Sequence, residues 1–124
     1  MSIAEKHKGS VVVLVPDADI TWHTQPELKN ALDGLSARGE CHIIIDLTNV
    51  REISGYGLGL LASRCGLFRR AHGDIRLAAA PDPVRKLLRV TNLDELFAQF
   101  DDADSAVRSF SLIDRGTGSE EDEP

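Results

Sequence analysis

The stretch from Ile43 to Phe68 constrains the fold of this chain more than any other. It opens with the short apolar run Ile43–Ile45, which Asp46-Leu47 closes, and a polar link follows. The next apolar residues recur at helical spacing, at Leu58, Leu61, Ala62, Cys65 and Phe68. This pattern predicts a strand that leads, through a turn of small residues, into a helix packed on a sheet. The unpaired backbone N–H groups of such a helix start favour contact with an anion or a partner.

The other segments predict a mixed β-sheet covered by helices, an α/β fold with the order β-β-α-β-α-β-α-β-α. Strands are expected at 3–8, 11–15, 43–47, 74–80 and 96–100. The first helix is expected to begin at a capping box of Thr24 and Glu27 and to stop at Gly39. The second is expected to end at His72, the third to start with Asp82 as its cap and to stop at Asn92, and the last to cover 101–112.

Length and charge limit the organisation and the class of partner. The 124 residues have room for one domain, which we place at 1–113, with an acidic tail at 114–124 that we expect to be disordered. The net charge of −6 argues against a nucleic-acid partner, which would need a basic stripe. No apolar run reaches the roughly 18 residues of a membrane span, and the first residues do not resemble a signal peptide, so we expect no membrane insertion and a cytoplasmic protein.

No pattern of catalytic or metal-binding residues stands out, and we expect neither an enzyme nor a cofactor. Cys41 and Cys65 lack the spacing of a metal site and are expected to be buried free thiols. The four histidines are scattered along the chain. The pattern of Gly57, Gly59 and Ala62 matches a dinucleotide fingerprint, but a polar link separates it from the preceding strand, which argues against NAD binding.

The central stretch resembles the STAS domain of bacterial anti-sigma factor antagonists. The resemblance lies in a buried strand ending in Asp46-Leu47, the run Gly57-Leu58-Gly59-Leu60-Leu61 after a turn, Pro26-Glu27-Leu28 at the first helix, and the segment from Val90 to Phe97. It spans about residues 8 to 112. In that family the turn usually reads Asp-Ser-Ser-Gly-Leu-Gly, and its first serine is phosphorylated by a kinase that is also the anti-sigma factor. The resemblance implies the STAS fold and a protein partner of this kind.

The family's phosphate acceptor has no counterpart here. The alignment puts Gly55 at the acceptor serine, Ser54 at the preceding aspartate and Tyr56 at the second serine. Ser54 could cap the helix, contact a partner without being phosphorylated, or be phosphorylated; the last needs a kinase to accept a shift of roughly 3.5 Å along the chain. We expect no phosphate on residue 55 and little or none on Ser54. Tyr56 is either an interface anchor or a ring folded over the helix start.

The segment Thr21-Trp22-His23 is the second candidate for partner contact. Thr21 aligns with an aspartate that, in the family, takes part in recognition of the kinase partner. Trp22, the single tryptophan, is either a lid on the core or an anchor for a partner.

The outer face of the second helix is the third candidate, and the residues alone suggest it. On a helical wheel, Leu60 and Leu67 lie opposite the predicted core stripe and near Arg64, which would form a docking or homodimer patch. The alternative is that exposed single leucines are ordinary.

Together these observations predict a protein-binding module that antagonises a kinase-type anti-sigma factor or a related regulator. Two alternatives stay open: a non-switching STAS subunit of a sensory or lipid-transport assembly, and a sensor of a small ligand.

Overall fold

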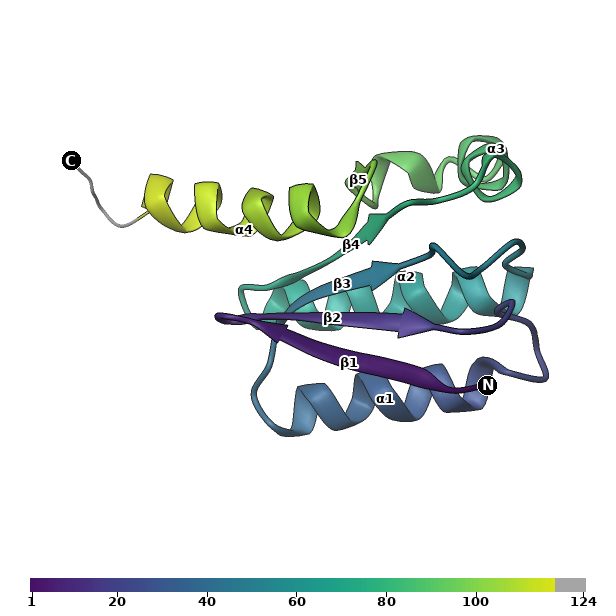
Figure 1. Cartoon of the computed structure of the whole chain (residues 1–124), viewed down its shortest axis with the longest axis horizontal. Helices are drawn as coiled ribbons and strands as arrows, with labels where there is room; N and C mark the ends of the chain where they lie inside the picture. Colours follow the sequence, from purple (N-terminus) through teal and green to yellow (C-terminus); the bar gives the residue numbers. More distant parts are fainter. Residues whose placement is uncertain (118–124) are drawn as a thin grey trace.

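The computed structural model describes the backbone of residues 1–117 and the side chains of residues 1–110. Within these residues, five strands form one sheet in the order β1-β2-β3-β4-β5 (Figure 1). The strands are β1 (Ile3–Lys8), β2 (Val11–Pro16), β3 (His42–Asp46), β4 (Asp74–Ala78) and β5 (Gln99–Phe100). The helices are α1 (Gln25–Ala37), α2 (Gly55–Arg70), α3 (Asp82–Val90) and α4 (Ala103–Thr117), and the short 3-10 helix η1 (Leu93–Glu95) follows α3.

The sheet is mixed, because β1 runs antiparallel to β2 while β2 to β5 are parallel to one another. β1 and β2 form a hairpin whose turn contains Gly9 in the left-handed region, at φ +64°. The parallel strands β2, β3 and β4 are buried almost throughout, which explains their continuous apolar sequences. Their carboxyl ends all lie at one edge of the sheet, the edge from which the chain enters the loops before α1 and α2.

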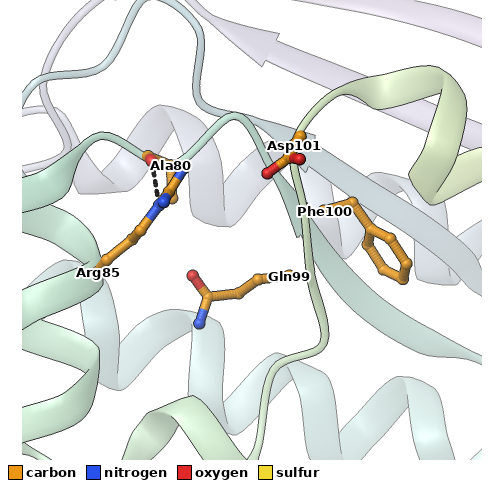
Figure 2. A pocket seen from close by; sticks show the side chains of 5 residues that line it. All are labelled: Ala80, Arg85, Gln99, Phe100 and Asp101. Carbon is orange, nitrogen blue, oxygen red and sulfur yellow. Dashed lines mark hydrogen bonds between the residues drawn. The ribbon is translucent and has the colours of Figure 1, made fainter.

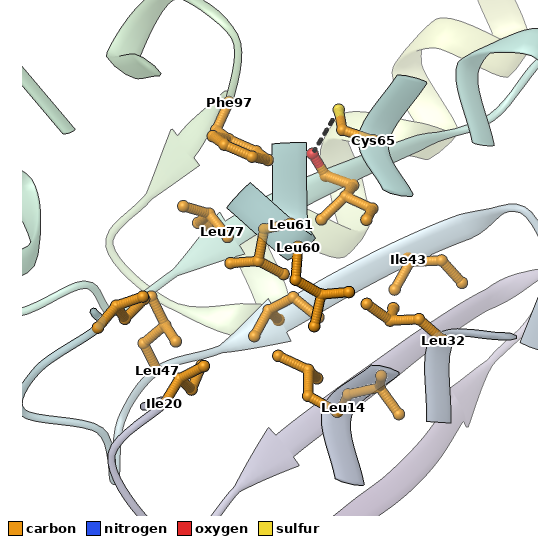
Figure 3. Packing of buried hydrophobic residues seen from close by; sticks show 14 of the residues in the cluster. Leu14, Ile20, Leu32, Ile43, Leu47, Leu60, Leu61, Cys65, Leu77 and Phe97 are labelled. Atoms are coloured by element: carbon orange, nitrogen blue, oxygen red, sulfur yellow. Dashed lines mark hydrogen bonds between the residues drawn. The ribbon is translucent and has the colours of Figure 1, made fainter. Parts of the chain in front are cut away.

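Helices cover both faces of the sheet, but unequally. The larger core lies on the side of α1, α2 and α3 and includes Leu14, Ile43 and Leu77 from the strands (Figure 3). The smaller core on the other face joins Val13 and Ile44 to Ala106 and Phe110 of α4. Figure 1 shows α1 and α4 on opposite sides of the sheet.

A buried arginine fastens α4 to the sheet. Arg76 in β4 is only 7% exposed, and its guanidinium carbon lies 3.9 Å from the centre of the Phe110 ring. Its guanidinium donates to the Ser109 hydroxyl at 2.6 Å and forms an ion pair with Asp74 at 3.1 Å. Because a buried charge must be paired, these contacts fix the position of α4 over β3 and β4.

The element order predicted from the sequence is confirmed, and several boundaries differ. The last strand is only Gln99–Phe100, because the residues before it form η1 and a turn. β4 ends at Ala78, since Ala79 adopts a left-handed conformation with φ 57°. The last helix begins at Ala103 and extends to Thr117. Residues 114–117 of the tail that was expected to be disordered belong to α4. Residues 118–124 lie outside the described part, so for them the expectation stays a prediction.

Two predicted helix caps are wrong. The Thr24 side chain makes no capping bond to α1, because its hydroxyl donates to the Asp19 carbonyl at 2.6 Å. α3 has Pro81 at its cap position, and Asp82 already lies in the first helical turn. The predicted stops are confirmed for Gly39 and Asn92, both of which have left-handed backbone conformations.

No helix among residues 1–117 is both long enough and apolar enough to cross a membrane.

Candidate functional site

Ser54 caps the start of α2. Its backbone is extended, and its hydroxyl oxygen accepts a hydrogen bond from the Gly57 N–H at 3.3 Å. The capping role considered for Ser54 in the sequence is therefore confirmed. Gly55 is the first helical residue and is exposed, and a Cβ added to it would meet no atom within 4 Å. The position that aligns with the family's acceptor serine is thus open to solvent and has no hydroxyl.

The loop before α1 is bound to the link before α2. Ile20 and Ile53 form an isolated parallel bridge, in which the Ile20 N–H donates to Glu52 at 3.1 Å and the Ser54 N–H donates to Ile20 at 2.8 Å. One carboxylate oxygen of Asp19 also accepts from the backbone N–H of Arg51 at 2.7 Å. These bonds bring Thr21–His23 beside Ser54–Tyr56, two segments that lie more than 30 residues apart in the sequence.

Thr21 organises this loop from within. Its hydroxyl oxygen accepts from the backbone N–H groups of His23 at 3.2 Å and of Thr24 at 3.4 Å. Its own N–H donates to the Thr24 hydroxyl at 2.9 Å. An aspartate side chain could also accept the first two of these bonds, so the threonine can form the same turn without an aspartate's charge.

Gly57 permits the close packing of α2 on this loop. A Cβ at Gly57 would lie 2.6 Å from the Ile20 Cγ2 and 2.8 Å from the Ile53 Cγ2. No side chain fits at such distances without displacement of its neighbours. The sequence contained no signal for this role beyond the glycine itself, because the contact joins distant segments.

Two large aromatic side chains stand exposed beside the helix start. Trp22 is 70% and Tyr56 is 72% exposed, so Trp22 is not a lid on the core and the Tyr56 ring does not lie folded over the helix start. The Trp22 ring meets the His23 ring edge to face, with centroids 5.4 Å apart. Trp22, Ser54, Gly55, Tyr56 and Gly59 line an open hollow of about 640 Å³, which we call the aromatic hollow. A neighbouring hollow of about 520 Å³ shares both rings and adds Gln25. The structure thus brings together Trp22, Ser54, Gly55 and Tyr56, all predicted from the sequence.

The predicted outer patch of α2 is wrong for two of its three residues. Leu60 is only 6% exposed and belongs to the large core, where Figure 3 shows it among the other core leucines and isoleucines. The Arg64 Nε lies 2.8 Å from an Asp33 carboxylate oxygen, so Arg64 joins α2 to α1. The helical-wheel prediction assumed that only the sheet buries α2. In the structure α1 lies beside α2 and buries a second part of its surface. Leu67 is 38% exposed and is the one member of the patch that faces solvent.

Arg64 and Lys29 also act on the ionisation of Asp33. Hydrogen bonds from the Arg64 guanidinium, and then from the Lys29 ammonium, hold the pKa of the Asp33 carboxyl below its ordinary value. At neutral pH the Arg64 guanidinium therefore lies beside a charged carboxylate, which it shares with the Lys29 ammonium.

The two cysteines form no disulfide within the described residues and have different surroundings. Cys65 is buried on the core side of α2, as predicted, whereas Cys41 is half-buried and not fully covered. Burial raises the pKa of the Cys65 thiol, and the adjacent Asp74 carboxylate raises it further. A thiol held protonated in this way is a poor nucleophile.

A smaller hollow lies at the ends of β4 and β5, and none of the residues that line it was predicted as a site residue. Its volume is about 220 Å³, and Figure 2 shows the Arg85 and Gln99 side chains with Ala80 and Asp101 around it. The Arg85 Nε donates to the Ala80 carbonyl at 2.8 Å, a bond that ties α3 to the end of β4. We assign this hollow no function.

Comparison with known proteins decides the family. The model of the STAS domain family matches residues 2–106, which is most of the chain. The chain belongs to the STAS domain family. An anti-sigma F factor antagonist from Paenibacillus polymyxa is 24% identical over 110 residues, which cover 88% of this chain and 93% of that protein.

Solved structures show the same fold. A provisionally assigned anti-sigma factor antagonist from Thermotoga maritima superposes with a TM-score of 0.82 at 22% identity, covering 86% of this chain and 92% of that one. An anti-sigma factor antagonist from Mycobacterium paratuberculosis gives a TM-score of 0.78 at 24% identity, with 87% and 92% covered. The predicted STAS fold is therefore confirmed, and this member of the family has an aromatic hollow at the start of α2.

Proposed function

We propose that this STAS domain is an anti-sigma factor antagonist that works in the cytoplasm by binding a kinase-type anti-sigma factor. The partner would lie against Thr21–His23 and Ser54–Tyr56, and its capture would release a sigma factor to direct transcription. The observation that carries the proposal is the exposed pair Trp22 and Tyr56 beside the capped start of α2. Exposed tryptophan and tyrosine are the side chains most often found as interface anchors.

The proposed binding does not depend on a phosphate at the family's acceptor position. Gly55 has no hydroxyl, and the Ser54 hydroxyl that precedes it is engaged with the Gly57 N–H. Phosphoryl transfer needs the attacking oxygen nearly in line with the phosphate, so a hydroxyl displaced by one residue is a poor substitute. In this proposal the domain binds its partner without being released by phosphorylation.

Direct binding tests the proposal. Each kinase-type anti-sigma factor encoded in the same genome is titrated with the wild-type domain and with Trp22→Ala, in calorimetry with and without ATP. We expect one of them to bind the wild type and to bind the variant at least about tenfold more weakly. If no such protein binds the wild type, the proposed function is wrong.

Mass spectrometry tests whether the domain is phosphorylated. After incubation of the domain with the bound kinase and ATP, the intact mass should stay unchanged. A stoichiometric gain of about 80 Da, one phosphate, would show that Ser54 or another residue has taken over as acceptor. The Ser54→Ala variant, treated in the same way, identifies Ser54 if the gain disappears.

The other two classes of function make different predictions. A subunit of a sensory or lipid-transport assembly would bind a structural partner and no kinase. A ligand sensor would be stabilised against heat by a metabolite in the absence of any protein.

A further inference from the structure

We propose that the aromatic hollow receives an apolar side chain from an acidic helix of the protein partner, and that this helix lies along the exposed face of α2. The inference rests on the proposed function, because it specifies the chemistry of the partner at the same surface. It is carried by three features: the lining of the hollow, the glycines of α2, and the charges along the helix.

The lining of the hollow suits an apolar side chain. The hollow is lined by the Trp22 and Tyr56 rings, which we call its walls, and by Ser54, Gly55 and Gly59. None of these five residues carries a charge. Two rings left more than two thirds exposed are stabilised when another apolar group removes them from water.

The glycines of α2 leave room for a close neighbour. A Cβ added at Gly55, Gly59 or Gly66 would meet no atom within 4 Å, whereas Gly57 is required by Ile20 and Ile53. Glycine is less favourable than alanine within a helix, and packing inside this chain gives no reason for the three open ones. They lie on the same side of α2 as Tyr56, where missing side chains let a second backbone approach the helix.

The openness of the hollow favours a protein over a small molecule. Small-molecule sites usually enclose 70–90% of the ligand surface. Here both walls stand in solvent, and the hollow continues past Gln25 into the neighbouring one. When an apolar side chain belongs to a helix, the rest of that helix also shields the open hollow from water. A free ligand provides no such shielding.

The charges of α2 indicate that the partner helix is acidic. α2 contains no acidic residue. Arg64 is paired with Asp33 and Arg69 with Asp74, but Arg70 is exposed and no salt bridge involves it within the described part of the chain. Arg70 lies on the same face as Tyr56, about 21 Å further along the helix. Carboxylates at that distance from the apolar anchor would meet Arg70, and a negative charge is also favoured at the start of α2.

The single tryptophan makes occupancy of the hollow directly measurable. Trp22 fluorescence is followed while the domain is titrated with the anti-sigma factor that binds it, and separately with a synthetic amphipathic helical peptide bearing leucines on one face and glutamates beside them. We expect a blue shift and protection from acrylamide quenching with both. The same peptide with lysines in place of the glutamates should bind at least about tenfold more weakly.

Two matched glycine variants separate binding from folding. Gly59→Ala adds a methyl group to the lining of the hollow, while Gly34→Ala makes the same change in α1, where the nearest atom to the new Cβ is 3.8 Å away. Both variants should resist urea better than the wild type, because alanine favours the helix. Gly59→Ala should nevertheless weaken binding at least about fivefold, and Gly34→Ala should leave it unchanged. Arg70→Glu should weaken binding more at low salt than at high salt.

Each outcome decides between the two proposals. If no anti-sigma factor binds, the proposed function fails and the peptide titration still decides the inference. If an anti-sigma factor binds equally well to the wild type, Gly59→Ala and Tyr56→Ala, the inference alone is wrong. If small apolar solutes stabilise the domain and the peptide does not bind it, the hollow takes a small ligand and not a helix. If sedimentation shows a dimer that Tyr56→Ala dissociates, the hollow takes a second copy of this chain. Either of these two results overturns the inference.

Discussion

Four glycines in α2 look alike in the sequence and have different roles in the structure. Gly57 lies against Ile20 and Ile53, where there is no space for a methyl group. Gly55, Gly59 and Gly66 border open space. The difference could not be read from the sequence, because it depends on the bridge that brings Ile20 to the start of the helix. The cap at Ser54 could be predicted, because capping needs only a local pattern.

Replacement of Gly57 by alanine should therefore destabilise the domain. We expect a loss of about 1–3 kcal/mol in the free energy of unfolding, the usual cost of forcing extra volume into a packed site. Urea unfolding monitored by circular dichroism measures it. Gly66→Ala is the control, and it should gain about 0.5–1 kcal/mol from helix propensity. A Gly57→Ala protein as stable as the wild type would show that α2 can move away from Ile20.

At the scale of the element, α2 is buried by two neighbours and not by one. Its core residues Leu58, Leu61 and Cys65 were predicted correctly, because they follow the face toward the sheet. Leu60 was placed on the wrong side, because the sequence of α2 carries no record that α1 lies alongside. The spacing of apolar residues shows which face of a helix points to the sheet. It does not show how much of the rest of the helix other elements bury.

The two leucines of α2 that were predicted as one patch should now behave differently. Leu60→Ala should cost about 2–5 kcal/mol, as expected when a buried leucine is removed, while Leu67→Ala should change stability by less than about 0.5 kcal/mol. Thermal and urea unfolding of both variants measure the difference. Equal, small effects would contradict the burial of Leu60 between α2 and α1.

The ion pair between Asp33 and Arg64 should make the contact between these helices depend on pH. The Asp33 pKa is lowered in the folded state, so its contribution to stability is present above the ordinary value of 3.8 and is lost as the pH falls through the lower folded value. In a double-mutant cycle with Asp33→Asn and Arg64→Gln, the coupling should be about 0.2–1 kcal/mol near neutral pH. It should vanish well below pH 3.8. A coupling that persists in acid would show that the contact is not ionic.

At the scale of the whole molecule, the sheet separates the candidate site from the core that α4 covers. The loops at the carboxyl ends of β2 and β3 form the candidate site with α2, and α4 seals the opposite face. The element order and the family fold could be predicted because each buried strand and each amphipathic helix has a local pattern. The last strand was predicted at 96–100, but its short extent could not be predicted, because two residues carry too little pattern. Its position depends on pairing with Leu77 and Ala78.

A change under α4 should therefore affect stability and leave the candidate site intact. Phe110→Ala removes the ring that packs on Arg76 and His42, and we expect a loss of about 3–5 kcal/mol in unfolding free energy. Hydrogen exchange should increase in α4 before it increases in α2. Binding of the partner, measured where the variant is still folded, should stay unchanged. A matching loss of affinity would mean that the two faces of the sheet are coupled.

The unfilled space around Gly55 has a practical consequence. A serine introduced there would point its side chain into solvent at the first turn of α2 and would not collide with the rest of the domain. The hydroxyl that related domains use for control could thus be installed by one substitution. If the domain binds as proposed, this substitution would let ATP and a kinase release it from its partner, which makes the scaffold a starting point for engineered transcriptional circuits.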